Sequence, residues 1–353
     1  MTGEDGSTRP LRPGPPQTRG RLASFRFRSP RLAANNPLHD PDTRDVLVYL
    51  PSGYEAGIRR YPVLYSLAAY TSSGPAQVAW RNHGENLPQR LDRLIADGAM
   101  DPVIVVMPDT FTALGGNQFV DSPALGDYAS HIALELVPEI DRRFRTVAEP
   151  GARGLFGKSS GGFGALHLAT CFPGLFGGVV SHAGDCGFDR VYQRDFVTCC
   201  DELAGTDGDA ERFVAGFWRA RRPSGRAFHA LMVLCLAASY SPAPGRPLNL
   251  ELPFDLETAR IDEAVFARWL AFDPVHYDAA RLEALRDLRG LWVDVGNRDQ
   301  YFMHYGTREF VRRLRDAGVP VRHEEFEGTH SGMDWRLDHS LPWLVGRLAS
   351  GSG

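Results

Sequence analysis

Short apolar runs alternate with amphipathic stretches along most of this sequence, and this alternation limits the folds available to it. A short apolar run bounded by turn residues is typical of a buried strand, whereas apolar residues at every third or fourth position indicate a helix. Strands alternating with helices favour an α/β fold with a mostly parallel central sheet flanked by helices. The expected strands are residues 46–50, 62–67, 103–107, 153–156, 178–181, 291–295 and 321–325, and the expected helices are residues 88–97, 128–144, 162–171, 308–317 and 340–348.

One long segment breaks this alternation after the strand expected at 178–181. Its pattern is mainly helical, and we expect it to form a cap inserted at about residues 186–275. Its aromatic side chains either line an acyl pocket or pack the cap onto the main domain, and packing is the commoner role for each one. They are Phe213, Phe217, Trp218, Phe228, Trp269 and Phe272. Residues 1–22 combine Pro, Gly and Arg without apolar periodicity, so we expect a disordered tail there and a single domain over residues 23–353.

Composition argues against several classes of protein. The chain has 43% hydrophobic and 23% charged residues, and its formal net charge of -4 gives no field that attracts nucleic acid. Its longest apolar run, residues 230–239, is shorter than the roughly 20 residues of a membrane-spanning helix, and the N-terminus lacks the apolar core of a secretory signal. Its five cysteines are odd in number and lack metal-ligand spacing. We expect a cytoplasmic protein with reduced thiols, no metal and no nucleic-acid or membrane partner, and a homo-oligomer stays open.

Residues 157–161 read GKSSG, which fits the G-x-S-x-G pattern of a nucleophile elbow. A strand expected before them and a helix expected after them are the setting in which small residues hold an exposed serine on a sharp turn. Two other interpretations exist. The same residues resemble the end of a phosphate-binding P-loop, but Ala152 stands where that motif needs glycine. Ser159 alternatively caps the helix that follows it. We expect Ser159 to be the nucleophile.

A histidine has to supply the base, because a serine hydroxyl is a weak nucleophile at neutral pH. In this arrangement the acid and then the histidine follow the serine along the chain, each on a loop after a strand. His330 lies in a loop of small residues after the strand expected at 321–325. His323 falls inside that strand and His339 lies beyond the loop, so His330 is the expected general base.

The acid and the oxyanion donors are expected at loops in the same way. Asp299 follows the strand before it closely enough to accept a hydrogen bond from the histidine, while Asp294 and Asp334 remain alternatives. The oxyanion needs two backbone N–H donors, and one is expected from Ser160, the residue after the nucleophile. The second should come from a loop after an early strand, where Tyr70 is our choice.

Taken together, residues 44–54 (RDVLVYLPSGY), 61–74 and 157–168, with the loops of Asp299 and His330, resemble the Putative esterase family. That family includes esterase D, feruloyl esterases and enterochelin esterases, and it is related to the mycolyltransferases. The resemblance runs from about residue 44 to residue 348, interrupted by the cap. It implies an α/β-hydrolase fold and hydrolysis of carboxylic esters through an acyl-enzyme, without a cofactor.

The resemblance also implies substrate contacts. Residues 110–121 resemble the family's substrate-side loop, which would place Asn117 and Phe119 near the pocket. The sequence departs from many relatives where Ala68-Ala69 replaces His-Gly before the oxyanion donor. It departs again at Lys158, whose charge either favours an anionic substrate or is merely solvated. We therefore expect a serine esterase for a small or medium ester, and the alternatives are an acyltransferase with the same triad or a catalytically silent binding protein.

Overall fold

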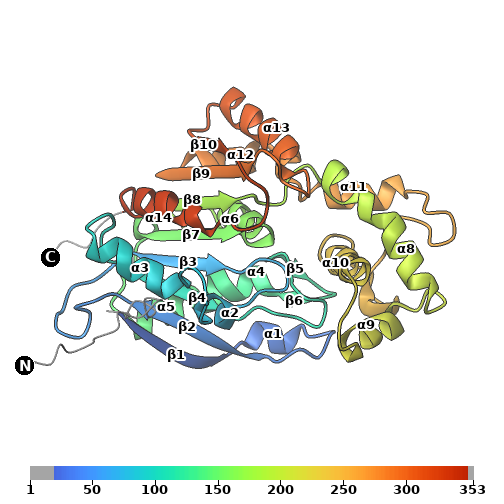
Figure 1. The fold of residues 1–353 in the computed structure, drawn as a ribbon, viewed down its shortest axis with the longest axis horizontal. Coiled ribbons are helices and arrows are strands. Elements are labelled where there is room, and N and C mark those ends of the chain that lie inside the picture. Colours follow the sequence, from blue (N-terminus) through green and yellow to red (C-terminus); the bar gives the residue numbers. More distant parts are fainter. Residues whose placement is uncertain (1–19, 349–353) are drawn as a thin grey trace, which may run out of the picture.

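The computed structural model describes residues 20–348, which form a central eight-stranded sheet covered by helices on both faces (Figure 1). Its strands are β1 (Arg21–Arg28), β2 (Thr43–Leu50), β3 (Val63–Leu67), β4 (Ile104–Pro108), β7 (Arg153–Lys158), β8 (Gly178–His182), β9 (Gly290–Gly296) and β10 (Arg322–Phe326). They are ordered β1-β2-β4-β3-β7-β8-β9-β10. β2 runs antiparallel to both β1 and β4, and the other neighbours are parallel.

The mostly parallel sheet predicted from the sequence is confirmed, and every expected strand is present with its ends shifted by at most three residues. Two features were not predicted: the edge strand β1, and a small hairpin of β5 (Asp121–Ser122) and β6 (Gly126–Asp127). β1 begins at Arg21, so the predicted boundary of the tail at residue 22 is wrong by two residues. Pairing with β2 orders this segment, from Arg21 opposite Leu50 onward. Residues 1–19 of the predicted tail lie outside the described residues.

Helices are present wherever the sequence predicts them, although one has an irregular centre. α4, a π-helical segment (His131–Leu136) and α5 together fill the helix expected at 128–144. The α-helices are α1 (Pro30–Ala34), α2 (Gly74–Val78), α3 (Leu87–Ala96), α4 (Tyr128–Ser130), α5 (Val137–Arg143), α6 (Ser160–Cys171), α7 (Phe188–Val191), α8 (Phe196–Ala204), α9 (Ala210–Arg219), α10 (Gly225–Tyr240), α11 (Glu263–Leu270), α12 (Ala279–Arg286), α13 (Met303–Asp316) and α14 (Leu337–Val345).

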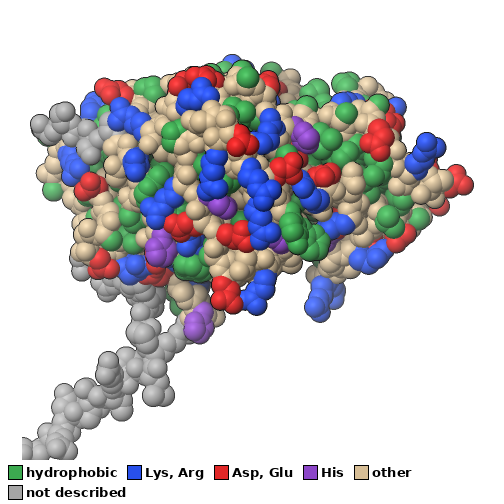
Figure 2. Space-filling view, turned by 90° about the horizontal axis from the view of Figure 1, so that it is seen from above, with side chains coloured by type: hydrophobic (Ala, Val, Ile, Leu, Met, Phe, Trp, Pro, Cys, Tyr) green, Lys and Arg blue, Asp and Glu red, His purple; other side chains and the backbone are tan. Residues whose placement is uncertain are grey.

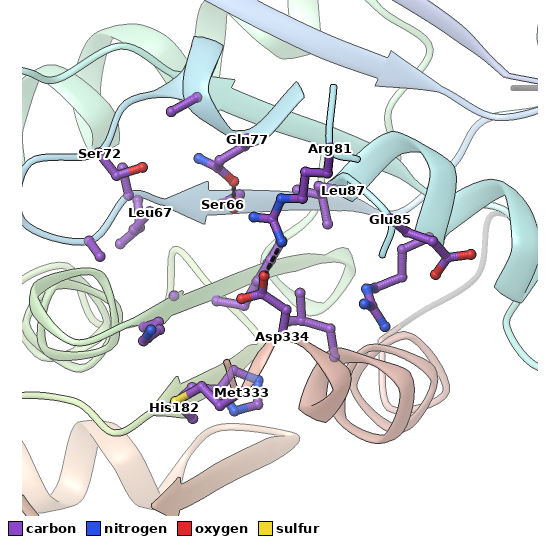
Figure 3. A pocket seen from close by; sticks show the side chains of 18 residues that line it. Ser66, Leu67, Ser72, Gln77, Arg81, Glu85, Leu87, His182, Met333 and Asp334 are labelled. Atoms are coloured by element: carbon purple, nitrogen blue, oxygen red, sulfur yellow. Dashed lines mark hydrogen bonds and ion pairs between the residues drawn. The ribbon is translucent and has the colours of Figure 1, made fainter. Parts of the chain in front are cut away.

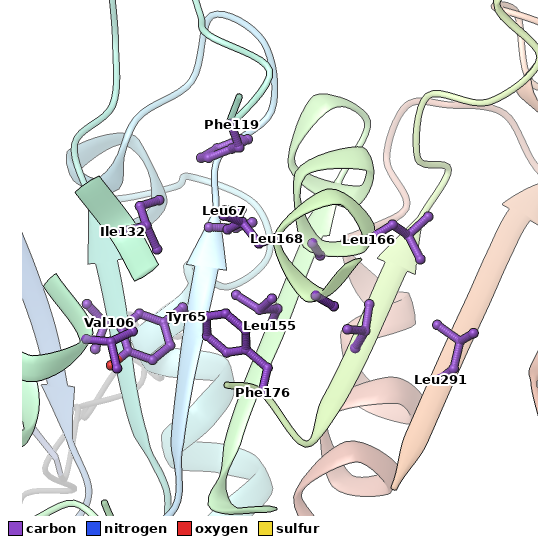
Figure 4. Packing of buried hydrophobic residues seen from close by; sticks show 14 of the residues in the cluster. Tyr65, Leu67, Val106, Phe119, Ile132, Leu155, Leu166, Leu168, Phe176 and Leu291 are labelled. Carbon is purple, nitrogen blue, oxygen red and sulfur yellow. The ribbon is translucent and has the colours of Figure 1, made fainter. Parts of the chain in front are cut away.

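Two hydrophobic layers lie on the two faces of the sheet, because successive residues of a strand point to opposite sides. On one face Tyr65 and Leu155 pack with Leu166 of α6, as Figure 4 shows. On the other face Leu64 belongs to a cluster that includes residues of α3 and α14. Because β3, β4 and β7 to β10 run parallel, their carboxyl ends meet at one edge of the sheet, where the loops that follow them come together.

Residues 186–275, which the sequence predicts as a cap, contain α7 to α11 and lie beside that edge of the sheet (Figure 1). Its apolar residues form one buried cluster with residues of the main domain, including Phe163 of α6 and Val295 of β9. Acidic and basic side chains are interspersed over the face of the molecule seen in Figure 2. None of the helices within residues 20–348 has the length and apolar character required to cross a bilayer.

Candidate active site

Ser159 lies on the sharp turn between β7 and α6. Its backbone has φ 55° and ψ -126°, a conformation that few residues other than glycine adopt. The glycines on either side make the turn possible, because a Cβ on Gly161 would lie 2.1 Å from the carbonyl oxygen of Leu67. A Cβ on Gly157 would lie 2.4 Å from the carbonyl carbon of Gly161. The small residues of the motif therefore let β7 and α6 approach closely enough to hold the serine at the strand end.

His330 and Asp299 form a close pair at the same edge of the sheet. The Nδ1 atom of His330 lies 2.7 Å from Oδ2 of Asp299, and the two residues are 7% and 2% exposed. The other carboxylate oxygen accepts a hydrogen bond of 2.8 Å from the N–H of Tyr301, and the backbone N–H of His330 donates to Gln300. These contacts fix the carboxylate and the histidine loop, and they leave Nε2 as the imidazole nitrogen that a substrate or a serine can use.

Asp294, the main alternative acid, belongs to a separate buried network. It lies 2.6 Å from Nδ1 of His182, whose Nε2 lies 2.9 Å from the hydroxyl of Ser340. Trp292 and Arg336 donate hydrogen bonds to its second oxygen. Burial raises the pKa of Asp294, but the charge of His182 and these hydrogen bonds outweigh it and hold the pKa below its ordinary value. This network ties β8, β9 and α14 together and does not contact His330.

The remaining alternatives are also engaged elsewhere. His323 on β10 donates a hydrogen bond of 3.0 Å from its Nδ1 atom to the carbonyl oxygen of Val293 on β9. His339 packs edge-on against Trp335. Asp334 forms an ion pair with Arg81. Of the acid and base candidates, the structure therefore brings only Asp299 and His330 together beside Ser159.

A cavity of about 160 Å³ connects these groups, and Ser159, His330 and Lys158 all line it. Apolar side chains of the cap form its opposite wall, including Val191, Phe228 and Met232. Of the aromatic cap residues singled out in the sequence, Phe228 lines the cavity. Four of the others lie in the cap cluster or pack against it: Phe213, Phe217, Trp269 and Phe272. Trp218 donates a hydrogen bond of 2.7 Å to the carbonyl of Ala113.

Asp185, just after β8, is the site residue that the sequence analysis missed. The Ser159 hydroxyl donates a hydrogen bond of 3.3 Å to it, and the Tyr192 hydroxyl donates one of 2.7 Å. Burial raises the pKa of the Asp185 carboxyl, while the Tyr192 hydrogen bond and the charge of His330 oppose this rise. Its position after a parallel strand was a usable signal, since functional groups of α/β proteins gather at the carboxyl ends of strands.

Both expected oxyanion donors line the cavity. The N–H of Ser160 is at the first position of α6, where a helix leaves its donors free. The N–H of Tyr70 has no backbone acceptor within residues 20–348. The Tyr70 side chain is held by a hydrogen bond of 2.9 Å to the carbonyl of Leu114 and packs edge-on against Phe228. These two N–H groups are therefore available to a ligand.

Neither Asn117 nor Phe119 lines the cavity, because both residues are used to build their loop. The Asn117 amide donates to the carbonyl of Thr110 and its oxygen accepts from the N–H of Phe119. Phe119 packs in the core beside Leu67 (Figure 4). Between them, Gln118 donates a hydrogen bond of 2.9 Å to the hydroxyl of Ser160, so the loop contacts the residue that follows the proposed nucleophile. Among residues 20–348, no cluster of three or more His, Cys, Asp or Glu side chains is arranged to hold a metal ion.

The sequence of this chain is similar to those of known esterases over most of its length. The model of the family described as "Putative esterase" matches residues 41–340. Esterase MT1326 and Esterase Rv1288, both of Mycobacterium tuberculosis, are each 27% identical to this chain over 351 residues. The match covers 94% of this chain, and the chain spans 60% of the length of these relatives.

Solved structures share the architecture. A ferulic acid esterase superposes with a TM-score of 0.60 at 20% identity and covers 94% of this chain and 100% of its own. An S-formylglutathione hydrolase from Agrobacterium tumefaciens superposes with a TM-score of 0.56 at 16% identity, covering 95% of this chain and 98% of its own. At these identities the likeness establishes the fold, and the expected α/β-hydrolase architecture is confirmed.

Proposed function

Because this chain belongs to the Putative esterase family, we propose that it hydrolyses carboxylic esters with Ser159 as nucleophile, His330 as general base and Asp299 as the residue that orients the histidine. The observation that carries the proposal is that His330, 2.7 Å from Asp299, lines the same cavity as a serine held on a strained elbow. A carboxylate bonded to Nδ1 selects the tautomer whose Nε2 is free to accept a proton.

The reaction starts with a change at the Ser159 hydroxyl, which in the resting arrangement donates to Asp185. Rotation of this hydroxyl toward His330 lets the imidazole take its proton as the oxygen attacks the ester carbonyl. The N–H groups of Tyr70 and Ser160 stabilise the oxyanion that forms. His330 then gives the proton to the departing alcohol, and water releases the acid from the acyl-enzyme in the same way. This chemistry requires no metal or organic cofactor.

The size and lining of the cavity favour a small or medium ester. A volume of about 160 Å³ lies below the roughly 300 Å³ at which pockets for drug-sized ligands begin. Phe228 and Met232 of α10 give the cavity an apolar wall, which suits a hydrocarbon acyl chain. The cap therefore limits which esters reach Ser159.

A fluorophosphonate probe tests the proposal directly, because it reacts with an activated serine. We expect labelling of the wild type and none of Ser159→Ala, together with a loss of ester turnover of about 10³-fold or more. Ser181→Ala is the matched control, since Ser181 is a buried serine on β8 outside the cavity and its hydroxyl has no partner among the described residues. Labelling of a folded Ser159→Ala protein would refute the assignment, and product analysis with added alcohols separates hydrolysis from acyl transfer.

A further inference from the structure

Lys158 is the only lysine among the 39 Lys and Arg residues of the sequence, and it directly precedes Ser159. The other members of that set are all arginine. An ammonium is a compact point charge that burial destabilises readily, whereas a guanidinium stays charged in proteins. This chain therefore places its one lysine ammonium beside the proposed nucleophile, in a wall of the catalytic cavity.

Lys158 also lines a second, larger pocket, which Figure 3 shows from close by. This pocket has a volume of about 310 Å³ and lies between the segment of α2, the end of β7 and the residues after the histidine loop. Ala69 and Lys158 line both this pocket and the catalytic cavity, so the two spaces adjoin across these residues. An ester held at Ser159 that extends past Lys158 therefore enters the second pocket.

The other charged side chains in the wall of the second pocket have partners of opposite charge. Arg81 pairs with Asp334, as the dashed line in Figure 3 shows. Arg90 pairs with Asp338, and Glu85 pairs with Arg93.

The Lys158 ammonium has no hydrogen-bond or ion-pair partner within residues 20–348. Burial lowers the pKa of Lys158, and the charges of Asp334 and Asp299 only partly oppose this. The pocket thus contains one cation whose charge no direct contact compensates.

A second polar group in this wall also lacks a partner. The side-chain oxygen of Gln77 accepts a hydrogen bond of 2.5 Å from Ser66, but its amide nitrogen is buried without an acceptor in the described part of the chain. A buried donor without an acceptor is unfavourable, because it has lost its hydrogen bonds to water. In Figure 3 the Gln77 and Arg81 side chains lie on the same side of the pocket, which therefore offers hydrogen-bond donors as well as positive charge.

We propose that the second pocket receives a carboxylate carried by the ester substrate, with the Lys158 ammonium as its charge partner. The inference rests on the proposed esterase function and names the class of its substrate. A single uncompensated cation matches a monoanion, and the nearby carboxylates of Glu85 and Asp334 disfavour a group of higher negative charge. The carboxylate belongs to either the acyl or the alcohol half of the ester, which the experiment separates.

Two matched pairs of esters test this. For the alcohol half, 4-acetoxybenzoate is compared with 4-acetoxybenzamide, and for the acyl half, the 4-nitrophenyl monoester of glutaric acid is compared with that of glutaramic acid. We expect the wild type to favour the carboxylate member of at least one pair in kcat/KM. Lys158→Met should lower this preference about tenfold or more, because it removes a charge-assisted hydrogen bond. Lys158→Arg, which keeps the charge, should retain most of it.

The outcomes distinguish a failure of the proposed carboxylate pocket from a failure of the proposed esterase function. If the neutral amides are hydrolysed in a Ser159-dependent way but the wild type has no preference for either carboxylate, the esterase stands and the carboxylate pocket is refuted. The same holds if Lys158→Met leaves the preference unchanged. If Ser159→Ala hydrolyses all four esters as the wild type does, the proposed function itself fails.

A binding measurement does not depend on turnover or on the folding of a Lys158 variant. Reductive methylation with ¹³C-formaldehyde keeps the charge of lysine and labels one side chain of this protein, because Lys158 is unique. In methylated Ser159→Ala protein, we expect 4-acetoxybenzoate or the glutarate monoester to shift the Lys158 methyl resonance saturably, and the matching amide to leave it in place. No shift with either carboxylate, or equal shifts with both amides, would overturn the inference.

Discussion

Ser159 has a backbone conformation that costs roughly 1–3 kcal/mol for a residue with a side chain, so neighbouring contacts must maintain it. Its N–H donates to the carbonyl of His182 and its carbonyl accepts from the N–H of Phe163, both at 2.9 Å. The first bond ties the turn to β8, and the second starts α6. The serine is thus held from both sides by rigid elements, which keeps its hydroxyl at the cavity while the backbone cannot relax.

Two aspartates near β9 each pair with a histidine, at nearly the same distance, and they provide a matched test of the triad. Asp299 lies 2.7 Å from His330 and Asp294 lies 2.6 Å from His182. Asp299→Asn should lower kcat about 10³- to 10⁴-fold with little change in the free energy of unfolding, because the amide no longer selects the productive tautomer. Steady-state kinetics and urea unfolding of the purified variant measure both quantities.

Asp294→Asn should give the opposite result. It removes one charge from a buried network in which Arg336 donates to the carboxylate, and breaking a buried ion pair costs about 3–5 kcal/mol of stability. The part of the protein that remains folded should keep most of its activity. If Asp294→Asn abolished kcat in a fully folded protein while Asp299→Asn did not, the acid of the triad would be Asp294.

The positions of the candidate site residues could be predicted only in part from the sequence. Ser159, His330 and Asp299 could be proposed from the sequence because each stands in a loop directly after a predicted strand, and parallel strands carry such loops to one edge. Asn117 and Phe119 were expected near the pocket but do not line the cavity, because closeness along a loop does not fix where a side chain points. Asp185 was missed although it also follows a strand, because its contact with Ser159 depends on tertiary packing that the sequence does not show.

At the scale of elements, buried strands were predictable and the edge strand was not. The central strands β3 and β4 are continuous apolar runs buried on both faces, which is the pattern of a parallel sheet covered by helices. β1 alternates exposed and half-buried residues and is rich in arginine, which is typical of an edge strand and resembles a charged tail. Its Phe25 and Phe27 pack against the core, but the register that brings them there is set by β2.

α6 is buried on all sides and contains a histidine, so we expect the stability of the protein to depend on pH. Burial, with a smaller contribution from Arg281, lowers the pKa of His167 to about 3. Below pH 6.5 the unfolded chain therefore binds a proton that the folded protein does not, so stability falls as the pH decreases from 6.5 toward 3. At pH 5 this group should cost about 2 kcal/mol. His167→Leu should remove that part of the loss.

Urea unfolding at pH 7.5 and pH 5.0 measures this effect as the change in stability between the two pH values. The comparison uses that change for each protein and not the absolute stabilities, since leucine also alters the stacking on Phe163. A loss of the same size in the wild type and in His167→Leu would mean that His167 accepts its proton in the folded state.

At the scale of the whole molecule, the cap and the sheet share one hydrophobic cluster. Phe196 of α8 and Trp269 of α11 belong to the same buried cluster as Phe163 of α6 and Val295 of β9. The sequence predicted the helices of the cap, but it left open whether its aromatic residues line a pocket or pack, because helical periodicity does not identify the partner of a buried face. In the structure most of them pack, so the cap is joined to the domain by a common core.

This shared core predicts that the cap unfolds together with the sheet. Separating the two would expose side chains such as Trp269 and Leu234, both fully buried, and each large side chain costs about 1.5–3 kcal/mol when it is exposed to water. We therefore expect hydrogen-exchange mass spectrometry in increasing urea to give the same unfolding midpoint for peptides from α10 and from β7. A lower midpoint for α10 would show that the cap opens as a separate unit. Access to Ser159 would then be controlled by detachment of the cap, and otherwise esters must enter through an intact cap.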